Sequence, residues 1–506
     1  MKNVKLFLGG TLCLGTLGMT IAKDVKPNVI FIAVDDMNDW VSPLGGIKGV
    51  KTPNLDRLAA MGVTFTNAHC AAPASAPSRL SVMTGVHPAR SNMMHNIPYD
   101  GAEWRKDPVM KDVVTIEQFF RANGYETLAG GKIYHTLAPP WLTLNQGEPE
   151  SWDYWWPSAY VPSAYQIPAT EKTRNPEGMR GKRPIKYFTW GAIECKDTKM
   201  PDYQLVDWVK HELSIKRDKP LFMAVGFIKP HIPWEVPKKY FDMYPLDSIP
   251  ILDIRADDLE DAFDHGRRSW HKFVMQNAYW KKVIQSYMAC ISFTDAQIGR
   301  LLDVIEKSQY NKNTIIVLWS DHGMHIGEKE NWEKFTLWEE STRVPLLFYV
   351  PGMTKGGTVN STSVSLIDIF PTLAELVGET PPANCDGQSV VPFLRGEKAN
   401  HQAAITAYKF QAPASGRGYA VRTERYRYIY YPEAGLEELY DHQKDPNEFV
   451  NIAYKKESRK IIAEHRAILN ERVPNMKWSN ETPKGYTITV DGLIHKDDFE
   501  SLLWNE

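Results

Sequence analysis

The sequence predicts an α/β protein in which a large, mostly parallel sheet lies between helices and a smaller antiparallel sheet follows. Three continuous apolar runs are typical of strands buried on both faces of a parallel sheet. Helical patterns at 52–61 and 113–120 lie between the first two runs. Strands that alternate with helices indicate an α/β fold, whose ligands bind just past the carboxyl ends of the strands. The runs and the polar residues that follow them are 28–34 with Asp35-Asp36, 220–227 with Lys229-Pro230-His231, and 314–320 with Asp321-His322.

Length and composition indicate a globular protein of more than one unit. The chain has 506 residues, of which 43% are hydrophobic and 24% charged, enough for a large domain and a smaller one. A formal net charge of -2 argues against nucleic acid or an anionic membrane surface as the partner. After the first 22 residues, no stretch is apolar for the roughly 20 residues that a membrane span needs, so we expect no stable membrane insertion.

The amino terminus is typical of a secretory signal peptide. A basic start, Met1 to Lys5, precedes an apolar run that closes on small residues at Ala22. We therefore expect a signal peptide at residues 1–22 and a periplasmic or secreted protein. A membrane anchor is the alternative, and the four glycines within the run argue against it.

The rest of the chain divides into two predicted domains, 23–385 and 386–506. Composition turns to Pro, Gly and polar residues around 378–400, which suggests a boundary. Beyond it, partial alternation at 418–431 predicts two strands joined by a turn, and a charged helix is expected near 455–472. Within the first domain, the Pro-rich stretch 138–183 predicts a long excursion, whose aromatic residues at 152–156 either line a sugar-binding cleft or pack against the domain.

The stretch from Ser75 to Gly85 holds a candidate nucleophile. Ser75 offers a hydroxyl, Pro77 sets the chain direction, and Arg79 follows one helical turn later, where it could hold an anion. Spacing alone favours a loop followed by an ordinary helix.

This stretch resembles the signature of type I sulfatases, in which Cys or Ser, any residue, Pro, any residue and Arg precede a run ending in Thr-Gly. The resemblance implies an alkaline-phosphatase-like fold and oxidation of the first signature residue to formylglycine. That residue is Ser75 here, so the resemblance implies a serine-type formylglycine-generating maturase as a partner. Cys70 lies five residues too early to take its place. A hydrated aldehyde has two hydroxyls: one attacks sulfur, and the other expels sulfate as the aldehyde re-forms.

A metal site is expected beside Ser75. Asp35, Asp36, Asp321 and His322 would supply mostly hard oxygen ligands, which suit Ca²⁺, or less well Mg²⁺, better than Zn²⁺. Each acidic pair alone is as typical of a helix cap or a solvated turn. The resemblance implies that these positions bind the metal together with an oxygen of the modified Ser75. The scattered cysteines, without CxxC spacing, argue against a zinc site built on sulfur.

The remaining site residues come from the same resemblance. The family has a Gly-Lys-x-x-His element that matches Lys132 and His135, which implies a sulfate contact for Lys132 and aldehyde regeneration for His135. His231 and Lys334 match the other sulfate-contacting residues, and His231 is expected to protonate the departing sugar oxygen. Together with these lysines, Arg79 would concentrate positive charge around the sulfate.

The expected substrate is a sulfated oligosaccharide or polysaccharide. Segments 225–233 and 332–334 look most like the iduronate-2-sulfatase group, whose bacterial relatives also act on ulvan and carrageenan. Two alternatives stay open. One is a phosphate or phosphonate ester hydrolase of the alkaline phosphatase superfamily with Ser75 unmodified, and the other is an inactive protein that binds sulfated glycans.

Overall fold

The computed structural model describes residues 26–96, 101–135, 151–156, 188–266, 269–411, 416–478, 486–488 and 493–495. The predicted signal peptide and most of the predicted excursion at 138–183 lie outside these ranges. Among the described residues, no helix combines the length and apolar character that crossing a bilayer requires.

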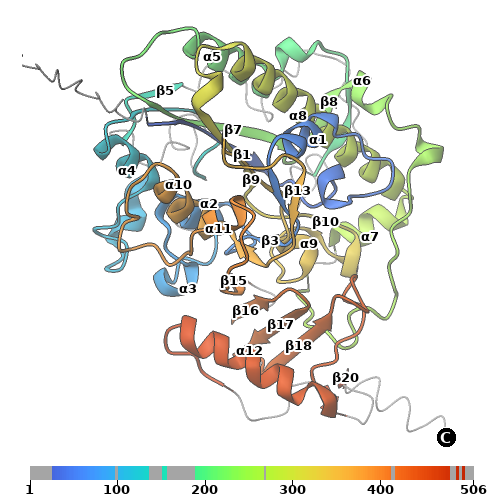
Figure 1. Cartoon of the computed structure of the whole chain (residues 1–506). Coiled ribbons are helices and arrows are strands. Elements are labelled where there is room, and N and C mark those ends of the chain that lie inside the picture. The colour runs from blue at the N-terminus through green and yellow to red at the C-terminus, as the bar shows by residue number, and fades with distance from the viewer. Residues whose placement is uncertain are drawn as a thin grey trace, which may run out of the picture.

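An eight-stranded mixed sheet, mostly parallel, forms the centre of the main domain (Figure 1). The strand β1 pairs in parallel with β7 on one side and β9 on the other, so three predicted strands are neighbours. The strand β12 runs antiparallel to both β9 and β2. In sheet order the strands are β13 (Thr358–Asn360), β2 (Val63–Phe65), β12 (Leu346–Tyr349), β9 (Thr314–Ser320), β1 (Asn28–Asp35), β7 (Leu221–Pro230), β4 (Glu126–Gly131) and β5 (Tyr154–Trp156).

Both faces of this sheet are covered by helices, which confirms the predicted α/β architecture. Alternate residues of β1 point to opposite faces, so Ile30 and Ile32 join one buried cluster and Val29 and Phe31 join the other. The first cluster includes helices α1 (Pro53–Met61), α5 (Pro201–Glu212) and α8 (Trp280–Lys307). The second includes α2 (Ser75–Thr84), α4 (Ile116–Ala122), α10 (Ile369–Leu376) and α11 (Val391–Leu394). The apolar runs are continuous because neither face of these strands meets water.

The structure corrects the expected start of one helix and decides between two expected roles for one aromatic residue. The helix expected from residue 113 begins at Ile116, because the Thr115 side chain and Gln118 form a capping box at its start. Of the aromatic cluster at 152–156, Trp152 is buried in the core beside the sheet, and β5 extends the sheet edge. Packing is therefore the role of Trp152, whereas Tyr154 is 46% exposed.

A four-stranded antiparallel sheet forms the carboxyl-terminal part (Figure 1). Its strands are β15 (Ala404–Phe410), β16 (Gly416–Arg422), β17 (Tyr426–Tyr431) and β18 (Leu436–Asp441), followed by α12 (Arg459–Arg472). The two strands predicted at 418–431 and the charged helix are confirmed. One face of the sheet packs on α12, and the other packs on Ala74, Leu337 and Trp338 of the main domain. The boundary after residue 385 stays a prediction, and Phe393 and Leu394 beyond it lie in the main core.

The remaining elements are short pieces that connect or edge these layers. The short helices are α3 (Pro88–Ser91), α6 (Lys238–Phe241), α7 (Ser269–Gln276) and α9 (Glu339–Thr342). The two-stranded pairs are β3 (Ala68–His69) with β14 (Val364–Ser365), β6 (Trp190–Ile193) with β8 (Trp234–Pro237), β10 (His325–Ile326) with β11 (Trp332–Glu333), and β19 (Tyr486–Ile488) with β20 (Leu493–His495).

A buried ion network joins the two sheets. Arg427 of β17 is fully buried, and its guanidinium contacts Glu339 of α9 and lies 2.6 Å from Glu448 Oε1. Arg422 Nε donates to Glu339 at 3.0 Å, and His442 Nε2 lies 2.9 Å from Glu448 Oε1. Glu339, His442 and Glu448 lie close enough together to hold a metal, but two guanidinium groups already neutralise the two carboxylates. The network is therefore a buried salt-bridge cluster that fastens the smaller sheet to the main domain.

Replacing Arg427 with Met should lower the free energy of unfolding by about 3–5 kcal/mol, because two buried carboxylates lose their partner. Urea unfolding followed by circular dichroism measures this. The matched control is Arg417→Met in β16 of the same sheet, whose ion pair with Glu433 is solvent-exposed; its unfolding midpoint should not move. Equal midpoints for both variants would contradict the network's role.

Candidate active site

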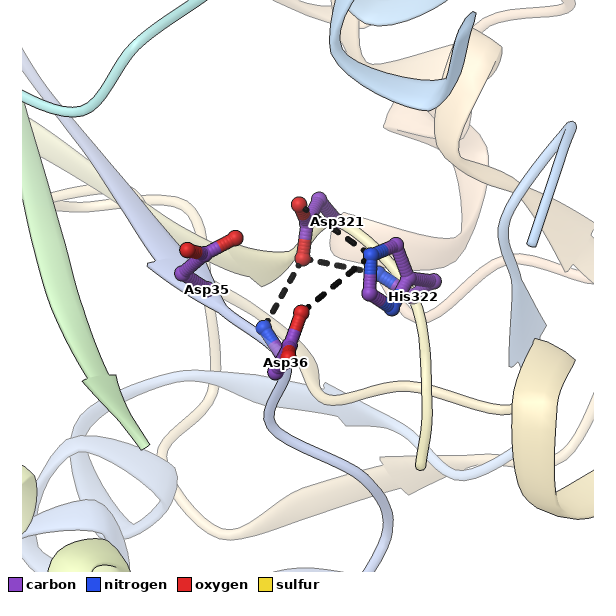
Figure 2. A group of neighbouring side chains, drawn as sticks. All are labelled: Asp35, Asp36, Asp321 and His322. Atoms are coloured by element: carbon purple, nitrogen blue, oxygen red, sulfur yellow. Dashed lines mark hydrogen bonds and ion pairs between the residues drawn. The ribbon is translucent and has the colours of Figure 1, made fainter. Parts of the chain in front are cut away.

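Four side chains meet at the carboxyl ends of β1 and β9 (Figure 2). Asp35 ends β1 and Asp36 follows it, whereas Asp321 and His322 follow β9. Parallel pairing places Val34 opposite Ser320, so both pairs leave the sheet at the same edge. One ligand atom from each lies within 4.8 Å of those of the others, and all four residues are fully buried. The predicted juxtaposition of the two polar pairs is therefore present.

The hydrogen bonds of His322 make this cluster a set of acceptors. Its Nδ1 lies 2.9 Å from the carbonyl oxygen of Gly323. A carbonyl only accepts, so Nδ1 carries a proton, and Nε2 is the ring nitrogen that can offer a lone pair to a metal. That Nε2 lies 3.3 Å from Asp36 Oδ1 and 3.5 Å from Asp321 Oδ2. Three carboxylates and one imidazole lone pair facing each other fit a divalent cation that prefers oxygen ligands, such as Ca²⁺ or Mg²⁺.

Ser75 is the first residue of α2, and its side chain faces the cluster. Its Oγ lies 3.0 Å from His322 Nε2 and 3.5 Å from Asp35 Oδ1, and the residue is 1% exposed. The amino-terminal end of a helix carries partial positive charge, which favours an anionic group at this position. Cys70 is not part of the site: its thiol points to the carbonyl of Ser341, and burial raises its pKa.

Arg79 lies one turn along α2 from Ser75 and connects several parts of the site. Its Nε donates to Asp321 Oδ2 at 2.9 Å, and Nη2 donates to Asp35 Oδ1 at 3.1 Å. Its Nη1 donates to the carbonyl of Lys132 at 2.6 Å. The guanidinium therefore fixes two carboxylates and the chain that carries Lys132. It is fully buried, so its first function is to hold the cluster together.

Lys132 reaches the site from the end of β4. Its Nζ contacts Asp35 Oδ2, and its backbone N–H donates to Gly226 of β7 at 2.9 Å. Two glycines permit this approach. Gly131 has φ +76°, and a Cβ on Gly226 would lie 2.2 Å from the carbonyl oxygen of Lys132. The backbone therefore requires glycine at positions 131 and 226 to bring the charge of Lys132 to the site.

Lys334 and His231 complete the ring around the carboxylates. Lys334 follows β11, and its Nζ donates to both oxygens of Asp36 at 2.8 and 2.9 Å. His231 follows β7, and its Nε2 lies 3.8 Å from Asp36 Oδ2. The Nδ1 of His231 lies 2.6 Å from the carbonyl oxygen of Ile232, so it is this nitrogen that carries the proton.

The charges of the cluster balance without a metal, because three carboxylates face Arg79, Lys132 and Lys334. Burial alone would raise the pKa of Asp35, but Lys132, His231 and Arg79 outweigh it and hold that pKa well below its usual value. Asp36 likewise has a lowered pKa, because His231 and Lys334 offset its burial. Asp35 and Asp36 are therefore ionised at neutral pH, as metal ligands must be.

His231 and His135 are neutral at the same pH. Burial lowers the pKa of His231 to about 4, and burial together with Lys132 lowers that of His135 well below its usual value. His135 is the last residue before the undescribed segment 136–150. Within the described part of the chain, neither of its ring nitrogens has a hydrogen-bond partner. The structure therefore brings eight of the ten predicted site residues into direct contact and places His231 and His135 beside them.

Sequence reasoning missed two residues that shape the site. Tyr287 of α8 donates its hydroxyl to the carbonyl of Asp36 at 2.7 Å, which holds the left-handed backbone of Asp36 (φ 60°). Asp202 of α5 accepts the backbone N–H groups of Ile228 and Lys229, both at 3.0 Å, just before His231. Both lie on helices that are distant in sequence from the residues they contact. Neither belongs to a local sequence pattern that predicts a role at the site.

Comparison with known proteins agrees with this geometry. The family model described as Sulfatase matches residues 27–379, and one described as N-sulphoglucosamine sulphohydrolase, C-terminal, matches residues 327–475. The chain is 38% identical over 472 residues to a protein named Sulfatase from Formosa agariphila, covering 91% of this chain and 90% of that protein. It is 31% identical over 408 residues to human iduronate 2-sulfatase, covering 71% and 70% of the two chains. Among solved structures, phosphonate monoester hydrolase of Agrobacterium radiobacter shares the fold, with a TM-score of 0.69, 23% identity, and coverage of 93% of this chain and 100% of that one.

Proposed function

Since the chain belongs to the sulfatase family of sulfuric ester hydrolases and has the alkaline-phosphatase-like fold, we propose that it is an exported enzyme that removes sulfate from a carbohydrate through a formylglycine made from Ser75. The family implies a metal ion and formylglycine. One observation carries the proposal: Ser75 Oγ lies 3.0 Å from His322 Nε2, at the edge of the only four-ligand cluster found among the described residues.

The charges of the site support a sulfate ester as substrate. Three carboxylates and three cations cancel, so a divalent ion held by Asp35, Asp36, Asp321 and His322 leaves an excess of two positive charges. Such a site attracts an anion although the whole chain has a formal charge of only -2. The bound ion would favour ionisation of the attacking hydroxyl and neutralise charge in the transition state. The hydrated aldehyde at position 75 would supply that hydroxyl.

The residues of the chain then have distinct roles. Lys132 and Lys334 each hold a carboxylate, and once those carboxylates face a metal their ammonium groups are available to sulfate oxygens. His231 carries its proton at Nδ1, so Nε2 is the atom that would take up a second proton and give it to the departing sugar oxygen. A sulfate beside this ring favours its protonated form, which offsets the effect of burial. His135 has two unpartnered ring nitrogens among the described residues and would accept the proton released when the aldehyde re-forms.

The substrate class rests on similarity to relatives. Human iduronate 2-sulfatase and an ulvan-active sulfatase from Formosa agariphila both match most of the chain. We therefore include sulfated uronic acids and algal polysaccharides among the candidate substrates. The phosphonate hydrolase shares only the fold at 23% identity, so it lends no support to phosphonate cleavage here.

Sulfate release from defined iduronate, rhamnose and galactose sulfates tests the proposed function, with a phenyl phosphonate ester as the rival substrate. The matured protein should release sulfate from at least one sugar and act more slowly on the phosphonate. Ser75→Ala should lower the rate by roughly 10⁴-fold or more, since it removes the nucleophile. Ser81→Ala, in the same helix, is the matched control and should keep full activity, because the Ser81 hydroxyl donates to the backbone carbonyl of Ser78 and not to a site residue. Tight binding of sulfated sugars without release would instead favour a glycan-binding protein.

Removing one carboxylate should abolish metal binding. Asp321→Asn keeps the size of the side chain but removes a charged ligand that also holds Arg79. Metal analysis of the purified wild type should find about one Ca²⁺ per chain, and the variant should have lost it together with activity. Asp303→Asn, at an exposed ion pair on α8, controls for the loss of charge. Unchanged calcium in Asp321→Asn would refute the proposed ligands.

The proposal of export rests on the predicted signal peptide at residues 1–22, which lie outside the described part of the structure. We expect the mature chain to begin at Lys23, which amino-terminal sequencing of the protein from the periplasm or medium would reveal. An intact Met1 on active protein from the cytoplasm would argue against export.

A further inference from the structure

The segment that carries Lys334 has an unusual backbone. Lys329, Glu330, Glu333 and Phe335 have φ values of 48°, 52°, 69° and 81°, although none is glycine. The left-handed region is unfavourable for residues with a Cβ, so such conformations persist only where surrounding contacts hold them. Four of them within seven residues indicate that something fixes this segment from outside.

Lys329 provides the fixation at one end. The residue is 3% exposed, and its Nζ lies 2.6 Å from Asp258 Oδ1 and 2.5 Å from the carbonyl oxygen of Glu448. The ammonium also lies over the rings of Trp338 and Tyr440, 5.1 and 5.3 Å from their centres. Tyr440 belongs to β18 and Glu448 follows it, so the smaller sheet and its following loop form two sides of this socket.

The chain between Lys329 and Lys334 is short, and hydrogen bonds hold it in place. Asn331 Nδ2 donates to the carbonyl of Lys329 at 2.6 Å, and the pairing of β10 with β11 places His325 opposite Glu333. At the other end, the N–H of Phe335 donates to the carbonyl of Pro73 at 3.1 Å, two residues before Ser75. The five-residue path from the socket to Lys334 therefore has little freedom.

We propose that Lys329 is a positioning residue for Lys334: the smaller sheet, through the socket around Lys329, fixes the Lys334 ammonium at the site. The proposal rests on the proposed function, because it takes Lys334 to contact sulfate. Lys329 adds no net charge, since Asp258 neutralises it at 2.6 Å and that carboxylate is itself 3% exposed. Its effect on the site is therefore one of geometry.

A double-mutant cycle tests this proposal. Lys329→Met combined with Asp258→Asn removes the buried cation and its counter-charge together, which avoids leaving an unpaired charge. The pair is introduced into the wild type and into Lys334→Ala, and kcat/KM for 4-nitrophenyl sulfate is divided by the fraction of converted Ser75. If Lys329 acts through Lys334, the pair should cost about tenfold or more in the wild type and less than about twofold in Lys334→Ala. Equal factors in both backgrounds would show a general structural role and overturn the proposal.

Hydrogen exchange tests the proposal even if the activity of Lys334→Ala is too low to measure. In the Lys329 and Asp258 pair variant, exchange should rise in peptides covering 327–337 and stay unchanged in α12. Unchanged exchange at 327–337 would overturn the proposal. Lys460→Met, at a side chain that is 88% exposed, is the matched control for both measurements. If the wild-type protein releases sulfate from no substrate, the proposed function is refuted. The exchange experiment would still show whether the socket around Lys329 fixes the segment that carries Lys334.

Discussion

Three buried carboxylates at one edge of the central sheet determine much of the rest of the structure. Asp35, Asp36 and Asp321 are fully buried, and burying charge is costly unless it is paired. Three cations therefore converge on them from separate parts of the chain: Arg79 from α2, Lys132 from the end of β4 and Lys334 from the segment after β11. The same arrangement can also bind a metal, because the acceptor atoms of the cluster lie close enough together to coordinate one divalent cation.

The smaller sheet is part of this arrangement rather than an appendage. Its inner face packs on Ala74, the residue before Ser75, and on Leu337 and Trp338, which follow Lys334. Arg427 ties it to α9 through Glu339, and Tyr440 closes the socket of Lys329. The signature helix and the Lys334 segment thus share one supporting surface.

Much of the fold and site could be predicted because local patterns marked it. The strands before Asp35 and Asp321 are apolar from Val29 to Val34 and from Ile315 to Trp319 because both faces are buried, and Arg79 follows Ser75 by one helical turn. The antiparallel β12 within the sheet and the contribution of Tyr287 could not be predicted in this way. Both depend on packing between segments that are far apart in sequence. Such packing leaves no periodic pattern in the local sequence of β12 or around Tyr287. Lys329 was missed for the same reason, since its partners at 258, 440 and 448 lie in other elements.

The proposed chemistry depends on conversion of the Ser75 side chain to an aldehyde beside the carboxylate cluster. The mass of the tryptic peptide 58–79, from active protein made in a host with the maturase, tests it most directly. Oxidation of the alcohol removes two hydrogens, so the peptide should be about two mass units lighter than the unmodified sequence. A fully unmodified serine in protein that still releases sulfate would contradict it.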